Sequence, residues 1–279
     1  METRLSFHGT GGSLFGRLLG GVLLTMLTFG IFLPWAIVWV ARWLFENTRL
    51  DTADGECRFR FTGGGGRLLG LMLVNGLLCL LTLGIYTPWA VVETLRYVCD
   101  GSEATGPDGR PWRLRFTGTG GQAFPILLKG VVFGILTLGI YVPWFLVGFS
   151  KWLDQGTRLD RDGVETGTAT FDGAGSELLV TLVIGVLLMF VTLGLYEPWF
   201  QVSLWRYFHG HTRFTVNHRP WSAEFDGTGW NYFLQLLIGV LLTMVTLGIY
   251  TPWMIARIAR FRLGHSRFLS PDAAEARPA

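Results

Sequence analysis

Apolar and polar positions follow one another along the chain in a pattern that recurs five times. A Gly-rich turn is followed by about twenty mostly apolar residues, a corner rich in Gly, Pro and Trp, and a shorter amphipathic segment that runs into polar, strand-like residues. In the second copy the corner reads LTLGIYTPW, at Leu81–Trp89. The other corners are Leu27–Trp35, Leu136–Trp144, Val191–Trp199 and Val245–Trp253. A fixed period of this kind predicts a repeat architecture.

The corner prolines set the period and the unit boundaries. They stand about 55 residues apart, at Pro34, Pro88, Pro143, Pro198 and Pro252. We expect one repeat-built domain over residues 1–270, with units of about 5–57, 58–112, 113–167, 168–221 and 222–270. Residues 271–279 are predicted to form a disordered tail. The prolines themselves are interpreted as structural corners.

Each repeat is expected to contain two helices and a β-hairpin. The apolar segment, for example Leu14–Leu33, is near the length that crosses ~30 Å of hydrocarbon. A second helix such as Pro34–Glu46 begins with proline at its first position, where the missing N–H costs nothing. Two strand-like runs around a polar turn follow, as at Asn47–Gly63. The predicted fold class is therefore a predominantly α-helical membrane protein with small β-hairpins.

The two ends of the chain carry complementary halves of a hairpin. Arg4–Gly9 matches the second strand of the repeat, and His265–Ser270 matches the first. Pairing of the N- and C-terminal strands would close the five repeats into a pseudo-five-fold ring without free strand edges. The alternative is an open or irregular stack with frayed end repeats.

Composition favours a membrane protein. Half of the 279 residues are hydrophobic and 15% are charged, against about a quarter charged in soluble domains. No cleavable signal peptide is recognisable at the start, so the internal apolar segments are expected to insert. The corners carry one charge, Glu197, whereas arginines gather near the hairpins, which predicts a multi-pass protein with its hairpin face and termini on the cytoplasmic side. An aromatic belt is predicted at the opposite interface, formed by Tyr86, Trp89, Tyr141, Trp144, Tyr196, Trp199, Tyr250 and Trp253.

Other classes receive less support. The net charge of +3 gives no case for nucleic-acid binding. Cys57, Cys79 and Cys99 lack the spacing of a zinc site or a disulfide framework. His209 and His211 have no third ligand at a suitable spacing. The chain has no P-loop, dinucleotide fingerprint, GxSxG or HExxH motif, so we predict no cofactor, metal or catalytic residue; a lipid-active enzyme would have to use the His209–His218 region.

A basic residue stands eight positions after each corner proline, on the polar side of the second helix. These residues form the candidate basic ring: Arg42, Arg96, Lys151, Arg206 and Arg260. Secondary basic positions follow in four repeats, at Arg49, Arg158, Arg213 and Arg267.

Three interpretations of the basic ring remain open. Five cations facing lipid at mid-bilayer would cost about 2.5–3.5 kcal/mol each, so they either line a water-filled vestibule or snorkel to cytoplasmic headgroups. In a vestibule they would bind anions such as lipid phosphates or a small anionic solute. The third possibility is local pairing with carboxylates such as Glu46 and Glu93. The expected partners are the lipid bilayer and anionic lipids.

The repeated TLGIYxPW corner followed by TRLD resembles the bacterial YjgN-like family of inner-membrane proteins, over nearly all of residues 5–270. This resemblance implies a location in the bacterial cytoplasmic membrane, and it brings no catalytic residue or substrate. Two functions are expected: a channel or transporter-like protein for a small anionic solute or ion, or a non-transporting scaffold or anionic-lipid-binding protein with a cytoplasmic hairpin ring.

Overall fold

The computed structural model describes residues 2–52 and 55–270, in which strands and helices follow one another in the order strand, helix, helix, strand. The helices are α1 (Gly11–Leu27), α2 (Leu33–Glu46), α3 (Gly65–Leu81), α4 (Thr87–Asp100), α5 (Gly120–Leu136), α6 (Val142–Gly156), α7 (Gly175–Val191), α8 (Glu197–Gly210), α9 (Gly229–Val245) and α10 (Thr251–Gly264). The strands are β1 (Glu2–Phe7), β2 (Thr48–Thr52), β3 (Gly55–Phe61), β4 (Ser102–Thr105), β5 (Pro111–Phe116), β6 (Thr157–Arg161), β7 (Val164–Phe171), β8 (Thr212–Val216), β9 (Arg219–Phe225) and β10 (Ser266–Leu269). The predicted tail, residues 271–279, lies outside the described residues.

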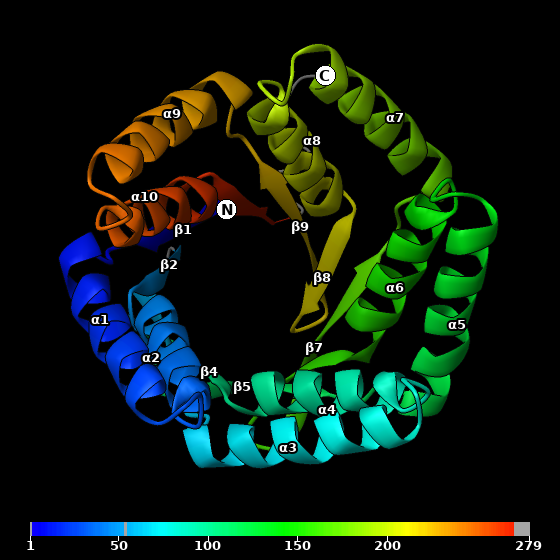
Figure 1. Cartoon of the computed structure of the whole chain (residues 1–279). Coiled ribbons are helices and arrows are strands. Elements are labelled where there is room, and N and C mark those ends of the chain that lie inside the picture. Colours follow the sequence, from blue (N-terminus) through cyan, green and yellow to red (C-terminus); the bar gives the residue numbers. More distant parts are fainter. Residues whose placement is uncertain (1, 53–54, 271–279) are drawn as a thin grey trace.

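The helices form two concentric rings (Figure 1). The first helix of each repeat (α1, α3, α5, α7, α9) lies on the outside, and the second (α2, α4, α6, α8, α10) lies on the inside. Each outer helix packs both on the inner helix of its own repeat and on that of the preceding repeat, and α1 packs on α10 to complete the circle. The strands lie behind the helix rings in this view.

The strands join into one closed antiparallel barrel of ten strands, in which neighbours in space follow the chain order. The last gap is closed by β1 and β10, which pair antiparallel with Thr3 opposite Phe268 and Arg4 opposite Arg267. The terminal strands therefore pair as their sequences predict, and the sheet has no free edge.

Five similar cores lie between the barrel and the helices. Each is built around the phenylalanine that ends the second strand of a hairpin, and each takes one residue from the inner helix of the preceding repeat. In the second core, Val38 of α2 packs with Phe61, Leu68 and Tyr97 of the next repeat. In the first, Ala256 of α10 packs with Phe7 and Trp43. Because every core is shared, no repeat buries its apolar residues alone.

Each corner lies beside the start of the next outer helix, and a glycine makes this contact possible. A Cβ on Gly65 would lie 2.5 Å from the Trp35 ring of the preceding corner, and the pairs Gly120–Trp89, Gly175–Trp144, Gly229–Trp199 and Gly11–Trp253 repeat the arrangement at 2.3 to 2.5 Å. The corners are therefore adjacent to the turns that leave the barrel. They do not form a separate end one helix length away from it.

The predicted fold class, a predominantly α-helical membrane protein with small β-hairpins, is wrong. The hairpins are parts of one ten-stranded barrel, and in the described part of the chain no helix has both the length and the apolar character needed to cross a bilayer. The prediction counted the corner as helix. The outer helix of repeat 1 has 17 residues and ends at Leu27, because the chain turns into left-handed conformation at Phe29 and Gly30.

Candidate functional site

The corners share a specific hydrogen-bonded structure. In repeat 2 the Thr82 hydroxyl donates to the Leu78 carbonyl oxygen at 2.7 Å and accepts from the Tyr86 N–H at 3.0 Å. The Gly84 N–H donates to the Cys79 carbonyl oxygen at 2.7 Å, which satisfies an end carbonyl of α3. The threonine of the motif thus links the end of the outer helix to the start of the inner one. The corresponding threonines are Thr28, Thr137, Thr192 and Thr246.

The residue at the tip of each corner is both strained and exposed. It has a φ of 50° to 52° although it carries a side chain, a conformation that costs of order 1–3 kcal/mol outside glycine. Its side chain is large and apolar and 92–98% exposed. The five tip residues are Phe29, Leu83, Leu138, Leu193 and Leu247. All five repeats therefore place a large apolar side chain in the same strained and exposed position.

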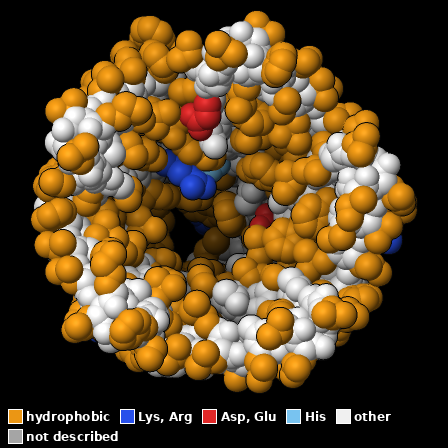
Figure 2. Space-filling model, viewed as in Figure 1, with side chains coloured by type: hydrophobic (Ala, Val, Ile, Leu, Met, Phe, Trp, Pro, Cys, Tyr) orange, Lys and Arg blue, Asp and Glu red, His pale blue; other side chains and the backbone are white. Residues whose placement is uncertain are grey.

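The tips belong to a wider apolar surface, which we call the helix face: the exposed apolar residues of the outer helices and corners. Figure 2 shows this side of the ring covered largely by hydrophobic side chains, with few charged ones. In repeat 1 it includes Leu23, Met26, Leu27 and Ile31, all more than half exposed. Soluble monomers rarely carry a continuous apolar patch of this kind.

The barrel carries the contrasting surface. Arg58, Arg113 and Arg115 are exposed on the same face of β3 and β5 and form ion pairs, such as Arg113–Glu103 at 3.0 Å and Arg115–Asp160 at 3.4 Å. Charged barrel and apolar helix face together make the ring amphipathic.

The basic ring holds the repeats together through backbone carbonyl groups. Four of its members donate from Nη2 to the carbonyl oxygen of a glycine in the turn that precedes the next outer helix. These hydrogen bonds are Arg42 to Gly63 (3.0 Å), Arg96 to Gly118 (2.9 Å), Arg206 to Gly227 (3.1 Å) and Arg260 to Gly9 (3.1 Å). The fifth member, Lys151, has no hydrogen-bond or ion-pair partner among the described residues.

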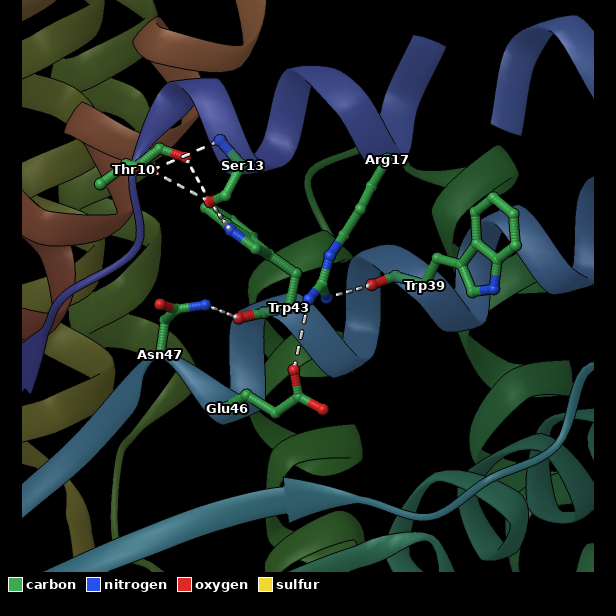
Figure 3. A network of polar contacts seen from close by, with 7 residues as sticks. All are labelled: Thr10, Ser13, Arg17, Trp39, Trp43, Glu46 and Asn47. Atoms are coloured by element: carbon green, nitrogen blue, oxygen red, sulfur yellow. Dashed lines mark hydrogen bonds and ion pairs between the residues drawn. The ribbon is translucent and has the colours of Figure 1, made fainter. Parts of the chain in front are cut away.

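Aromatic residues next to the basic ring hold the turn of their own repeat. The Tyr97 hydroxyl donates to the Gly64 carbonyl oxygen at 3.1 Å, and Trp43 Nε1 donates to Ser13 Oγ at 2.9 Å. Figure 3 shows the network around Trp43, in which Arg17 of α1 also reaches the Trp39 carbonyl oxygen and Glu46 of α2. Consecutive side chains on one inner helix therefore bind two successive repeats.

The secondary basic positions are paired with carboxylates. Arg49 contacts Glu56 at 2.6 Å, Arg158 contacts Glu165 at 3.3 Å and Arg213 contacts Asp172 at 3.4 Å. Arg267 pairs with Asp226. The Arg49 guanidinium also lowers the pKa of the Glu56 carboxyl. These four arginines thus belong to the charged network of the barrel and its turns.

Two titratable groups lie half-buried at equivalent positions of α6 and α8. Burial raises the pKa of Asp154 to about 6 and lowers the pKa of His209. His209 Nε2 lies 3.2 Å from Ser266 Oγ, whereas His211 Nε2 lies 3.2 Å from the Glu177 carboxylate. The two histidines thus contact different elements.

A family described as bacterial protein of unknown function (DUF898) matches residues 2–54, 56–106, 166–224 and 220–271, which together make up more than half of the chain. The chain belongs to this family. The DUF898 segments leave residues 107–165 unmatched, and that stretch contains Lys151, the one member of the basic ring that is not arginine.

Two relatives of this DUF898 chain support the resemblance to the YjgN-like family. Inner membrane protein YjgN of Salmonella typhimurium is 36% identical over 80 residues, which are 29% of this chain and 19% of the relative. Inner membrane protein YjgN of Escherichia coli K12 is 50% identical over 40 residues, 14% of this chain and 10% of the relative. The aligned segments therefore span less than a fifth of these relatives. The resemblance is confirmed, and no solved structure matches the chain.

Sequence reasoning found the basic ring and the corner prolines but missed two features. It treated the residue before the corner glycine, Leu83 in repeat 2, as part of a helix, although the glycine that follows it is a typical helix-end residue. It also passed over Asn75, which lies in the middle of an apolar helix.

Proposed function

We propose that the protein is a monotopic membrane-binding ring of the bacterial inner membrane, seated with its helix face in the lipid and its charged barrel toward water. The observation that carries the proposal is the set of five apolar tips held exposed in left-handed conformation. Full burial of such a side chain is worth about 1.5–3 kcal/mol, so five tips on one ring bind a hydrocarbon surface strongly. The name of the relatives, inner membrane protein YjgN, agrees with this location.

The proposal is tested by replacing all five tips with asparagine, which tolerates the left-handed conformation. Because the strain is reduced, the variant is expected to fold and to unfold at the same or a higher temperature. Its flotation with vesicles of phosphatidylethanolamine and phosphatidylglycerol is expected to fall at least tenfold. The control is Val164→Asn, which removes an exposed apolar residue from the β6–β7 hairpin on the barrel side. Flotation of the five-tip variant at the wild-type level would contradict the proposal.

The basic ring favours a more specific version of this function, a scaffold that organises anionic lipids. The hydrogen bond to the turn uses Nη2 of Arg96, Arg206 and Arg260, whose side chains are exposed, and a guanidinium has five N–H donors. The remaining donors are available to a lipid phosphate. Arg96→Gln with Arg206→Gln is expected to reduce the preference for phosphatidylglycerol over phosphatidylcholine vesicles. An unchanged preference would show that the basic ring does not contribute to lipid binding.

A second candidate is conduction of a small anionic solute through the middle of the ring. Figure 2 shows the centre hollowed, with a Lys or Arg side chain at the rim of the opening. The test is chloride flux in proteoliposomes. Chloride flux equal to that of protein-free vesicles would exclude conduction, and the membrane-binding proposal would stand.

A further inference from the structure

Repeat 2 contains an apolar cavity whose wall includes two residues that differ in kind from those of the other repeats. The cavity has a volume of about 380 Å³ and lies between α2, α3 and α4. Its wall includes Val38, Phe61, Leu68 and Tyr97 of the second core. It also includes Asn75 and Thr94, the polar residues of an otherwise apolar lining.

The two polar residues of the cavity wall differ from the residues at the equivalent positions of the other repeats. Where α3 has Asn75, the other outer helices have glycine: Gly21, Gly130, Gly185 and Gly239. Where α4 has Thr94, the other inner helices have larger apolar residues: Val40, Phe149, Leu204 and Ile258.

The residue of the inner helix that faces this point is large in three repeats and small in two. In repeats 3, 4 and 5 a large side chain packs directly on the glycine, since a Cβ on Gly130 would lie 2.3 Å from Phe145, on Gly185 2.1 Å from Phe200, and on Gly239 2.6 Å from Met254. In repeats 1 and 2 the corresponding residue is alanine: Ala36, which lies 2.9 Å from a Cβ built on Gly21, and Ala90. What distinguishes repeat 2 is therefore the pair of polar residues in the cavity wall, Asn75 in place of glycine and Thr94 in place of a larger apolar residue.

Asn75 is buried without a partner. Its side chain is 7% exposed, and its Oδ1 has no hydrogen bond within the described part of the chain. An unsatisfied buried polar group costs about 1–3 kcal/mol. Thr94 Oγ1 donates to the Ala90 carbonyl oxygen at 2.8 Å and keeps its lone pairs free to accept. The Tyr97 hydroxyl is already bonded to Gly64.

We propose that this cavity is a binding site for a neutral alkyl chain that bears one hydroxyl group, with the hydroxyl at Asn75. A hydroxyl both donates and accepts, so it can satisfy the carbonyl and the amino side of the amide together. If a methylene is taken as about the size of a water molecule, ~30 Å³, the cavity holds a chain on the order of ten carbons. Its volume is at the lower end of ligand sites, and the apolar lining suits hydrocarbon.

The test uses 1-decanol and decane as probes, with the full chain in nanodiscs of long-chain phospholipid. Met72 lines the cavity, so the NMR signal of its ¹³C-labelled methyl group reports occupancy. Met244, which is exposed on α9, reports partition of the probe into the surrounding bilayer. We expect a saturable shift at Met72 that exceeds the shift at Met244, and binding of decanol roughly three- to tenfold tighter than decane.

Two variants separate the hydroxyl contact from the cavity. Asn75→Gly introduces the residue of the other four repeats, and is expected to retain decane binding and lose the preference for decanol. Thr94→Phe introduces into the cavity wall the residue that repeat 3 has at this position, Phe149, and is expected to remove the Met72 shift for both probes. Equal binding of both probes to the wild type, a Met72 shift no larger than that of Met244, or a preference unchanged in Asn75→Gly would each overturn the proposal. Membrane seating is measured separately by flotation of the five-tip variant, so a failure of that proposal is distinguished from a failure of this one.

Discussion

The guanidinium of Arg260 donates a 3.1 Å hydrogen bond to the carbonyl oxygen of Gly9, and so joins the last repeat to the first. The same contact links Arg96 to Gly118 inside the chain. One side-chain interaction therefore serves both to stack neighbouring repeats and to close the ring. The two positions differ because Arg260 joins the last and first repeats, which are not consecutive in the chain.

Arg260→Gln and Arg96→Gln are expected to have similar effects on stability and different effects on closure. Each removes a hydrogen bond from a charged donor, and because both side chains are exposed we expect a loss of about 1 to 2 kcal/mol. Only Arg260→Gln is expected to speed hydrogen exchange of the β1 and β10 amides, because those strands meet at the ring closure. Equal exchange in the two variants would show that strand pairing alone closes the ring.

Lys151→Arg is expected to stabilise the protein. The carbonyl that corresponds to the other contacts belongs to Gly173, and lysine at this position makes no hydrogen bond among the described residues. A guanidinium there restores the fifth contact, with an expected gain of about 0.5 to 1 kcal/mol. Thermal unfolding followed by circular dichroism measures the effect. Lys129→Arg, at an exposed position of α5, is the control and is expected to change little; the same rise in both variants would argue against the contact.

How far the sequence predicts this structure depends on the kind of interaction. The proline interval, the helix start at Pro88 and the pairing of the terminal strands follow from local patterns that the structure retains. The predicted fold class was wrong because the apolar character of a segment does not show whether it crosses a bilayer. A helix that packs on one side and exposes apolar side chains on the other has a similar composition. The basic ring was found by recurrence, but its partners are backbone carbonyl groups, which no side-chain pattern marks. Asn75 could have been found by aligning the repeats, since glycine occupies its position in the other four.

Gly65→Ala and Gly66→Ala are expected to have opposite effects although the residues are adjacent. A Cβ on Gly65 would lie 2.5 Å from the Trp35 ring, whereas a Cβ on Gly66 would come no closer than 4.0 Å to it. Overpacking at Gly65 is expected to cost about 1–3 kcal/mol. Alanine at Gly66 is expected to gain up to about 1 kcal/mol, because it lowers the entropy of the unfolded chain. Chemical denaturation of both variants tests this, and a stable Gly65→Ala protein would show that the Trp35 contact is not tight.

The carboxyl group of Asp154 makes stability depend on pH. Phe45, Cys99, His209 and Leu263 take its position in the other repeats, and burial there raises its pKa from 3.8 to about 6. The folded state therefore binds more protons than the unfolded state between these values, so the stabilisation is fully present below pH 3.8 and is lost as the pH rises through 6.

Asp154→Asn removes this dependence. At pH 7 the variant is expected to be more stable than the wild type by about 1 kcal/mol after allowance for solvent screening. The reason is that the amide stays neutral, so burial imposes no cost of the kind that it imposes on the charged carboxylate. Near pH 4 the two proteins are expected to unfold at nearly the same denaturant concentration. Denaturation at both pH values measures the difference between them. A stability difference that does not change with pH would show that Asp154 ionises in the folded ring as it does in the unfolded chain.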